Sequence, residues 1–169
     1  MNYKYIYDKV YKAAPDYGDH NHGSGCVDFI NKYGFNRIIE LGCGSMAWLE
    51  MLDARHCVGV DVSAPNATVM LDITKGLPFD DGEFDLVAAF DVLEHIALDD
   101  LDFVLSEMKR MAPRCIVSIG YIESGSKISG LDELHLTIEN QRWWIDRIKS
   151  NGMMFNRILP PKYLCFGEW

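Results

Sequence analysis

The sequence has no continuous apolar run long enough to cross a bilayer, and its first residues lack the apolar core and cleavage site of a secretory signal peptide. Positive charge is also scarce, because 16 Lys and Arg residues stand against 25 Asp and Glu residues and leave a net charge of -9. Sequence-independent binding to a phosphate backbone needs clustered Lys and Arg, so this balance disfavours a nucleic-acid substrate. We therefore expect a cytoplasmic protein that does not bind membranes.

Paired cysteine motifs are missing as well. The five cysteines are an odd number without Cys-x-x-Cys spacing, and three of them lie in apolar strand-like runs. Buried free thiols in a reducing compartment fit this pattern best. His20 and His22 are close in sequence, but two histidines without a third ligand are a weak metal motif, and we expect no metal. The loop from Tyr17 to Gly23 is either a lid over a ligand or an ordinary solvated loop.

Hydrophobic residues make up 49% of the 169 residues and charged residues 24%, values typical of a folded globular chain. We expect one domain over residues 1–169, since a chain of this size can bury its own core. Its first part, residues 1–34, is expected to form a helical cap and lid. The segment from Tyr3 to Val10 places apolar residues on one face of a docking helix, and a second helix is expected between Ser24 and Gly34.

One stretch, residues 37–61, contains the most informative motif of the sequence. Arg37 to Leu41 is a short apolar run, Gly42 to Ser45 is a turn with two glycines, and residues 47–52 can be helical. A second apolar run, residues 57–60, ends in Asp61. In a parallel βαβ unit the glycine loop lets a ligand approach the backbone at a helix N-terminus. The acid after the second strand can accept hydrogen bonds from ribose hydroxyls, so the stretch predicts a nucleotide-cofactor site.

Apolar runs then alternate with helical patterns. Three runs indicate further strands: residues 68–71, 84–90 and 115–119. An apolar stripe predicts a helix over residues 101–111, and Thr137 is expected to cap the last helix. The final runs, residues 153–159 and 163–166, suit an antiparallel pair. This alternation predicts an α/β fold with a mostly parallel sheet and helices on both faces.

Acidic residues and the glycine loop follow several of the predicted strands. Glu40 ends the first strand, Asp61 the second, Asp72 the third and Asp91 the fourth. Ligands of parallel α/β sheets bind at the carboxyl ends of the strands. One pocket is therefore expected to gather these side chains.

The motifs are specific enough to indicate a family. They are Glu40-Leu41-Gly42-Cys43-Gly44, Val60-Asp61-Val62-Ser63, Leu71-Asp72-Ile73, Leu77-Pro78-Phe79 with Phe84-Asp85-Leu86-Val87, and Asp91-Val92-Leu93-Glu94-His95. Together they resemble the class I S-adenosylmethionine-dependent methyltransferases, especially those that modify small molecules. The resemblance implies a three-layer Rossmann-like sandwich whose seven-stranded sheet is mostly parallel and has a reversed last strand. It also implies S-adenosyl-L-methionine as the cofactor and a small-molecule acceptor as the partner.

The resemblance further implies which residues contact the cofactor: Glu40, Gly42, Cys43, Gly44, Asp61, Val62, Asp72, Ile73 and Asp91. The glycine loop would lie against the methionine part of the cofactor, with Glu40 bracing it. Asp61 would take both ribose hydroxyls. Asp72 would accept from the adenine amino group, and the isoleucine after it would pack on the ring. Asp91 would face the methionine amino end and the methyl-transfer site. Met46 departs from the family, which commonly has a third glycine at this position.

His135, His95 and Asp91 are the catalytic candidates. A histidine exchanges protons near neutral pH, so either histidine suits a base, although packing or capping explains each of them as well. The loop from Tyr121 to Glu133 is expected to contribute specificity, because the exit of the fifth strand borders the acceptor site. The predicted reaction is methyl transfer to oxygen or nitrogen of a small polar acceptor, with a sugar-like group as one option.

Two alternatives remain open. A nicotinamide-dependent oxidoreductase uses the same glycine loop and ribose acid, although it would not require Asp72-Ile73 or the segment from Asp91 to His95. A non-catalytic cofactor-binding partner of another subunit is suggested by the short chain, which leaves little room for acceptor recognition. Titration with both cofactors and a methylation assay on the isolated chain separate the three hypotheses.

Overall fold

The computed structural model describes residues 1–19, 22–121, 134–159 and 164–169 of the chain. Its helices are α1 (Tyr3–Ala13), α2 (Val27–Tyr33), α3 (Leu98–Met111) and α4 (Gln141–Ser150). Its strands are β1 (Arg37–Leu41), β2 (His56–Asp61), β3 (Val69–Met70), β4 (Leu86–Phe90), β5 (Arg114–Ser118), β6 (Met154–Leu159) and β7 (Leu164–Glu168). The order of these elements follows the alternation expected from the sequence.

All of the strands join one seven-stranded sheet in the order β3-β2-β1-β4-β5-β7-β6. Strands β1 to β5 pair in parallel, whereas β7 runs antiparallel to both of its neighbours, β5 and β6. The last strand in the sequence is therefore the reversed one, and the predicted antiparallel pair at the end of the chain is confirmed. The strand order reverses between β1 and β4, which is where α/β sheets bind ligands.

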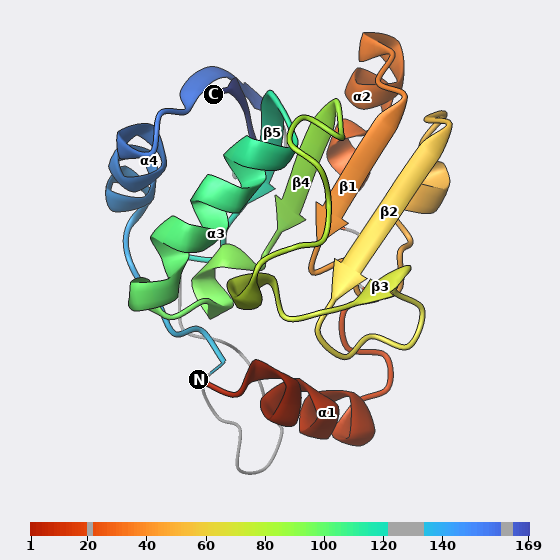
Figure 1. The fold of residues 1–169 in the computed structure, drawn as a ribbon, viewed down its shortest axis with the longest axis vertical. Helices are drawn as coiled ribbons and strands as arrows, with labels where there is room; N and C mark the ends of the chain where they lie inside the picture. Colours follow the sequence, from red (N-terminus) through yellow and green to blue (C-terminus); the bar gives the residue numbers. More distant parts are fainter. Residues whose placement is uncertain (20–21, 122–133, 160–163) are drawn as a thin grey trace.

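Helices cover both faces of the sheet and make three layers (Figure 1). Alternate residues of β1 point to opposite faces. Ile39 and Leu41 belong to the apolar cluster that includes α3 and α4, whereas Ile38 belongs to a second cluster that includes α2. The predicted three-layer α/β sandwich is thus confirmed.

Helix α3 shows why its sequence forms a helix. Its buried stripe is Leu101, Val104, Leu105, Met108 and Met111, all 0% exposed. Acidic residues occupy its first turn and basic residues its last, which suits the helix macrodipole. The side chain of Arg110 ties the helix to the loop before β4, because Nη1 donates to Phe79 O at 2.6 Å and Nη2 to Leu77 O at 3.1 Å. Ion pairs with Glu107 and Asp81 complete this contact.

Three details of the predicted helices are wrong. The segment 47–52 forms only a 3-10 turn at Leu49–Met51, because Leu52 is extended and the following N–H, of Asp53, donates to Asn31 Oδ1. Ser24 does not cap α2, since a 3-10 turn, Ser24–Cys26, precedes that helix and makes no side-chain cap. The cap of α4 is Asn140, whose side chain accepts from Trp143 N at 3.0 Å. Thr137 instead donates its hydroxyl to Ile96 O at 2.8 Å.

Helix α1 lies across the carboxyl ends of the sheet strands (Figure 1). Asn2 caps it, and Tyr3 and Val10 are its buried residues. The Tyr3 hydroxyl accepts from Ala97 N at 2.8 Å and donates to Asp100 Oδ2 at 3.1 Å. These bonds fix the start of α1 to the start of α3, so the predicted docking helix is confirmed.

Two expectations about the chain's surroundings can be compared with the structure. Within the described residues, no helix combines the length and the apolar character that a membrane span requires. Cys26, Cys43 and Cys115 are buried free thiols, and Cys57 is a half-buried one.

Candidate functional site

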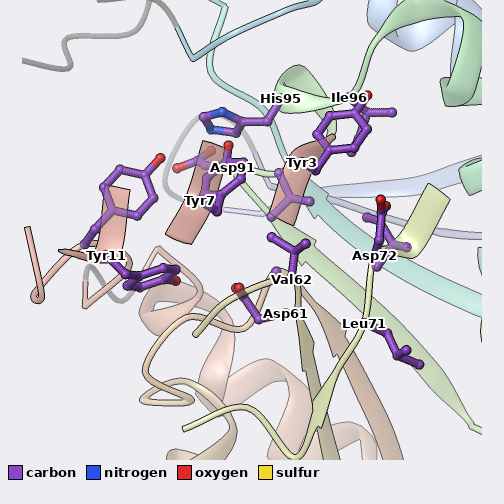
Figure 2. Close-up of a pocket in the computed structure, with 14 residues that line it drawn as sticks. Tyr3, Tyr7, Tyr11, Asp61, Val62, Leu71, Asp72, Asp91, His95 and Ile96 are labelled. Atoms are coloured by element: carbon purple, nitrogen blue, oxygen red, sulfur yellow. The ribbon is translucent and has the colours of Figure 1, made fainter. Parts of the chain in front are cut away.

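A pocket opens where α1 faces the carboxyl ends of β1, β2 and β4 (Figure 2). Its lining consists of Tyr3, Tyr7, Tyr11, Tyr17, Gly42, Asp61, Val62, Leu71, Asp72, Ile73, Asp91, Val92, His95 and Ile96. The sequence motifs that follow four different strands therefore meet in one cavity. Figure 2 shows side chains of α1 and side chains from the strand ends converging on it.

The glycine loop after β1 is held by β2. Gly42 N donates to Val60 O at 2.7 Å and Cys43 N to the same oxygen at 3.1 Å. Gly42 has φ +69°, and a Cβ there would lie 2.1 Å from Val92 Cγ2, so the loop requires a glycine at this position. Gly42 lines the pocket, whereas the Cys43 side chain packs against Gly59.

The backbone of the N-terminal segment closes on the second glycine of the loop. Gly44 has φ +50°, and a Cβ there would lie 2.5 Å from Gly18 O. Met46, which replaces the family's third glycine, also has a positive φ, +67°. A side chain in this left-handed region costs about 1–2 kcal/mol. The backbone at position 46 is therefore left-handed in this chain, and this conformation explains why the family commonly has glycine there.

Asp61 is the best-connected acid of the site. Its Oδ1 accepts from Ser63 N and Ala64 N, both at 2.9 Å, and its Oδ2 accepts from Gly44 N at 3.2 Å. It is 8% exposed. Burial, followed by the nearby charge of this carboxylate, raises the pKa of Tyr11. The carboxylate is thus fixed in place between the glycine loop and α1.

Asp72, Ile73 and Val62 form a second side of the pocket. Asp72 caps the 3-10 turn Ile73–Lys75, and its Oδ1 accepts from Thr74 N at 2.9 Å and Thr74 Oγ1 at 2.7 Å. Ile73 is 8% exposed, and Val62 is half-buried. An acid next to two apolar side chains gives this side both a polar and a flat apolar surface.

Asp91 sits at the end of β4 with a positive φ, +51°, which is uncommon outside glycine. Its Oδ1 accepts from Ser118 Oγ at 3.0 Å, and its Oδ2 lies 2.7 Å from His22 Nδ1. Burial works to raise the pKa of Asp91, but the contacts with His22 and Ser118 and the nearby His95 together outweigh it and hold that pKa below its ordinary value. The same hydrogen bond raises the pKa of His22.

Glu40 is buried on β1 and does not line the pocket. Its Oε2 makes no hydrogen bond to any residue that the structure describes. Burial, followed by the nearby charge of Asp61, raises the pKa of Glu40 well above its ordinary value.

The two candidate bases lie together. His95 lines the pocket, and its Nδ1 is 2.9 Å from Leu134 O. A carbonyl oxygen only accepts, so this contact assigns the proton to Nδ1. His135 is outside the pocket lining, but its ring lies edge-on to that of His95 with centroids 4.7 Å apart. Glu94, the residue before His95, is 0% exposed, and burial, with Asp91 nearby, raises its pKa to about 8.

Sequence reasoning missed the aromatic side of the pocket. Tyr3, Tyr7 and Tyr11 recur every four residues and so share one face of α1, and Tyr17 packs on the last two of them with centroids 6.1 and 5.8 Å apart. The four-residue spacing of Tyr3, Tyr7 and Tyr11 was the sequence signal that could have predicted this side of the pocket. His20, Asn21 and residues 122–133, which include most of the predicted specificity loop, lie outside the described residues.

Comparison with known proteins agrees with this arrangement. Residues 39–114 match the profile of a family described as Methyltransferase domain. No curated protein sequence matches the chain.

Three solved structures have a similar fold. One chain of the complex between the Haloferax volcanii Trm112 methyltransferase activator and its proposed methyltransferase matches with a TM-score of 0.67 and 14% identity, over 95% of this chain and 96% of that one. The PH0226 protein from Pyrococcus horikoshii OT3 matches with a TM-score of 0.67 and 17% identity, over 95% and 98%. The YcgJ protein from Bacillus subtilis matches with a TM-score of 0.60 and 16% identity, over 80% and 70%.

At these identities the solved structures establish the fold alone, and the family profile adds the motifs that follow β1 to β4. Residues 39–114 therefore match the methyltransferase domain family, and the chain has the fold of the class I S-adenosylmethionine-dependent methyltransferases.

Proposed function

We propose that this chain is an S-adenosylmethionine-dependent methyltransferase that transfers a methyl group to oxygen or nitrogen of a small polar acceptor. One observation carries the proposal: the glycine loop, Asp61, Asp72 with Ile73, and Asp91 come from four strand ends and meet around one pocket. The family profile over residues 39–114 supports the same activity.

The donor set of the pocket fits this cofactor. S-adenosylmethionine carries positive charge on its sulfonium and amino groups, and the lining offers the carboxylates of Asp61, Asp72 and Asp91. Glu40, buried on β1 outside the lining, has an oxygen, Oε2, without a hydrogen-bond partner among the described residues, which suits its predicted role of bracing the glycine loop. Asp61 suits the ribose hydroxyls, and Asp72 with Ile73 suits the adenine, as the resemblance implies.

The same features weigh against a nicotinamide dinucleotide. Its pyrophosphate is negative and is commonly held at a helix N-terminus or by basic side chains. The described lining of the pocket holds no Lys or Arg, and the glycine loop leads only into the 3-10 turn Leu49–Met51. An acidic pocket of this kind repels a pyrophosphate.

The chain's own contribution to the chemistry is mainly alignment. Bound S-adenosylmethionine supplies an electrophilic methyl group, so a correctly placed acceptor atom needs little further activation. Asp91, fixed by Ser118, provides a carboxylate at the predicted transfer site. When the acceptor must lose a proton, His95 can take it on Nε2, because Nδ1 already carries one.

We propose further that the chain is a single domain in which residues 1–34 form the cap and lid. Tyr11 contacts Asp61, His22 contacts Asp91, and the Gly18 backbone meets Gly44. These contacts use groups predicted to bind the cofactor. A ligand that binds Asp61 and Asp91 therefore has to displace them.

Calorimetric titration of the chain with S-adenosylmethionine, its demethylated product and NAD tests the proposal. We expect the first two to bind and NAD not to bind. Asp61→Asn removes charge-assisted hydrogen bonds and should weaken binding by about 10- to 100-fold. Asp99→Asn, an exposed acid at the start of α3, is the matched control and should bind normally. NAD binding in place of S-adenosylmethionine would exclude the proposal.

A second candidate function is a cofactor-binding subunit that acts with a partner. It is favoured by the similarity, over 95% of this chain, to one chain of the Haloferax volcanii activator complex. Incubation of the isolated chain with methyl-labelled cofactor and a panel of small polar acceptors distinguishes the two. Cofactor binding without labelling of any acceptor would favour the subunit.

A further inference from the structure

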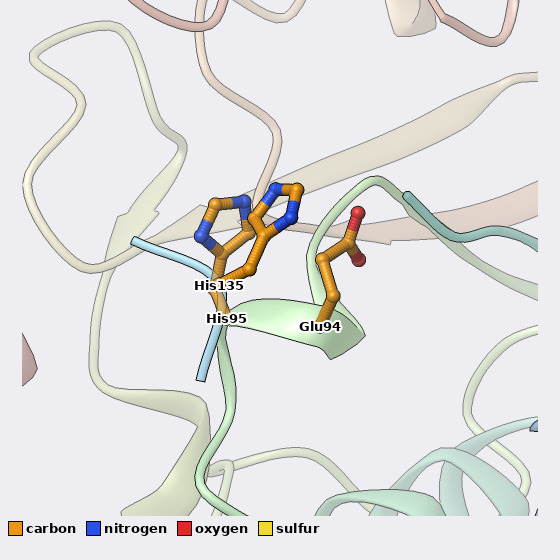
Figure 3. A group of neighbouring side chains, drawn as sticks. All are labelled: Glu94, His95 and His135. Atoms are coloured by element: carbon orange, nitrogen blue, oxygen red, sulfur yellow. The ribbon is translucent and has the colours of Figure 1, made fainter. Parts of the chain in front are cut away.

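A cluster of three side chains lies beside the pocket, formed by Glu94, His95 and His135 (Figure 3). Each residue offers one ligand atom, and the three atoms lie within 4.8 Å of one another. We propose that this cluster binds one divalent transition-metal cation. The inference does not depend on the proposed function, because cation binding is measured without a methyl donor.

Backbone hydrogen bonds bring the three side chains together before any cation binds. Glu94 and His95 are neighbours in the 3-10 turn Leu93–His95. The carbonyl of Glu94 accepts from Leu136 N at 2.8 Å and from Thr137 N at 3.0 Å, which holds the segment carrying His135 against that turn. Donor atoms around a cation of this kind lie roughly 3–4 Å apart, so small side-chain rotations complete the site.

The surrounding hydrogen bonds orient two of the ligands. Nδ1 of His95 donates to Leu134 O at 2.9 Å, which directs the lone pair of this imidazole to Nε2. Gly120 N donates to Glu94 Oε1 at 2.5 Å. Metal-binding histidines and carboxylates are typically held by such outer contacts.

Gly120 also provides the necessary space. A Cβ at this position would lie 2.8 Å from Glu94 Oε1 and 3.1 Å from His135 Cε1. The absence of a side chain therefore allows the carboxylate and the second imidazole to approach each other.

The Glu94 carboxylate provides an independent reason to expect a ligand. The residue is 0% exposed, and its Oε2 makes no hydrogen bond to the residues that the structure describes. A buried carboxylate oxygen without a partner is costly, and a cation at the cluster supplies the missing contact and charge.

The donor set indicates the class of cation. Two imidazole nitrogens and one carboxylate suit Mn²⁺, Fe²⁺, Co²⁺ or Zn²⁺, whereas Mg²⁺ and Ca²⁺ prefer oxygen ligands alone. Three protein ligands leave further coordination positions for water or an acceptor. His95 belongs to both the cluster and the pocket lining, so the cation would lie in the pocket wall.

His95 Nε2 has one lone pair, so it cannot bind a cation and accept a proton at the same time. A cation at this nitrogen would lower the pKa of an acceptor oxygen bound to the cation, so that the acceptor could release its proton to solvent water without a base from the protein. For the proposed methyl transfer, this favours an acceptor that presents a hydroxyl group.

Titration of the full chain with Co²⁺ alone, followed by visible absorption, tests the site. We expect one Co²⁺ per chain, with absorption bands of mixed nitrogen and oxygen ligation. His135→Gln and Glu94→Gln should each lower Co²⁺ affinity at least tenfold. His56→Gln, at the exposed start of β2 at the opposite end of the sheet, should leave it unchanged.

Circular dichroism and the thermal midpoint of each variant check that it folds. The half-buried His135 is the safer substitution, and a Co²⁺-dependent rise in the midpoint should occur in the wild type and not in His135→Gln. A wild-type chain that binds no Co²⁺ would overturn the proposal. So would a folded His135→Gln or Glu94→Gln variant that binds as tightly as the wild type.

Discussion

The contact between Gly44 and Gly18 can be tested with a single methyl group. Gly44→Ala places a Cβ 2.5 Å from the Gly18 carbonyl oxygen, whereas ordinary contacts are about 3.5 Å. The N-terminal segment must therefore withdraw by roughly 1 Å or leave the glycine loop altogether. Gly34→Ala is a matched control, because Gly34 also has a positive φ, +80°, but a Cβ there meets nothing within 4 Å.

The two variants separate backbone strain from the steric contact. Alanine in the left-handed region costs about 1–2 kcal/mol at either position. Overpacking adds about 1–3 kcal/mol at Gly44 alone, unless the segment opens at a smaller cost. For a chain of this size each kcal/mol lowers the thermal midpoint by about 2–4 °C. We therefore expect Gly34→Ala to lose only about 1–2 kcal/mol to backbone strain, as much as alanine costs in any left-handed position.

Hydrogen exchange of α1 amides, measured beside the thermal midpoint, detects the opening. Gly44→Ala should speed exchange in α1, and Gly34→Ala should leave it as in the wild type. The reasoning is refuted when the two variants match in both midpoint and α1 exchange, because the Gly18 contact would then be absent in solution.

Two further predictions concern contacts outside the glycine loop. Because the hydrogen bond to Asp91 raises the pKa of His22, the stabilisation by this pair is complete below the ordinary histidine pKa of about 6.5 and is lost as pH rises through the raised value. The lowered pKa of Asp91 sets the acid limit, so protease resistance of residues 1–19 should fall as pH rises above about 6.5 in the wild type and less in His22→Gln. Arg110→Gln should lower the free energy of unfolding by about 1–3 kcal/mol, because two carbonyls and two acids lose their donor. Arg142→Gln, which breaks an exposed ion pair on α4, should leave the free energy of unfolding in urea nearly unchanged.

The sheet was predictable because its pattern is local. Buried parallel strands are nearly all apolar, and residues 84–90 predicted β4 almost to its ends. Glycines and acids mark the ends of such strands, so Gly42, Asp61 and Asp91 could be placed at one edge of the sheet before any coordinates.

The contacts across the pocket were not predictable, because they join segments far apart in the sequence. Nothing local to His22 indicates Asp91 as its partner, and Tyr11 reaches Asp61 only through the docking of α1. The complete burial of Glu94 likewise depends on the segment near His135. The 3-10 turn at Leu49–Met51 replaced a predicted helix because tertiary contacts outweighed weak helical propensity.

Helix α1 buries two of its eleven residues, whereas α3 buries five of its fourteen. Local stability follows buried contacts, so we expect α1 to open at a smaller free energy than α3. For a ligand that needs the open form, the apparent dissociation constant equals the intrinsic one divided by the open fraction. Each 1.4 kcal/mol by which α1 docking favours the closed form therefore weakens the apparent affinity about tenfold.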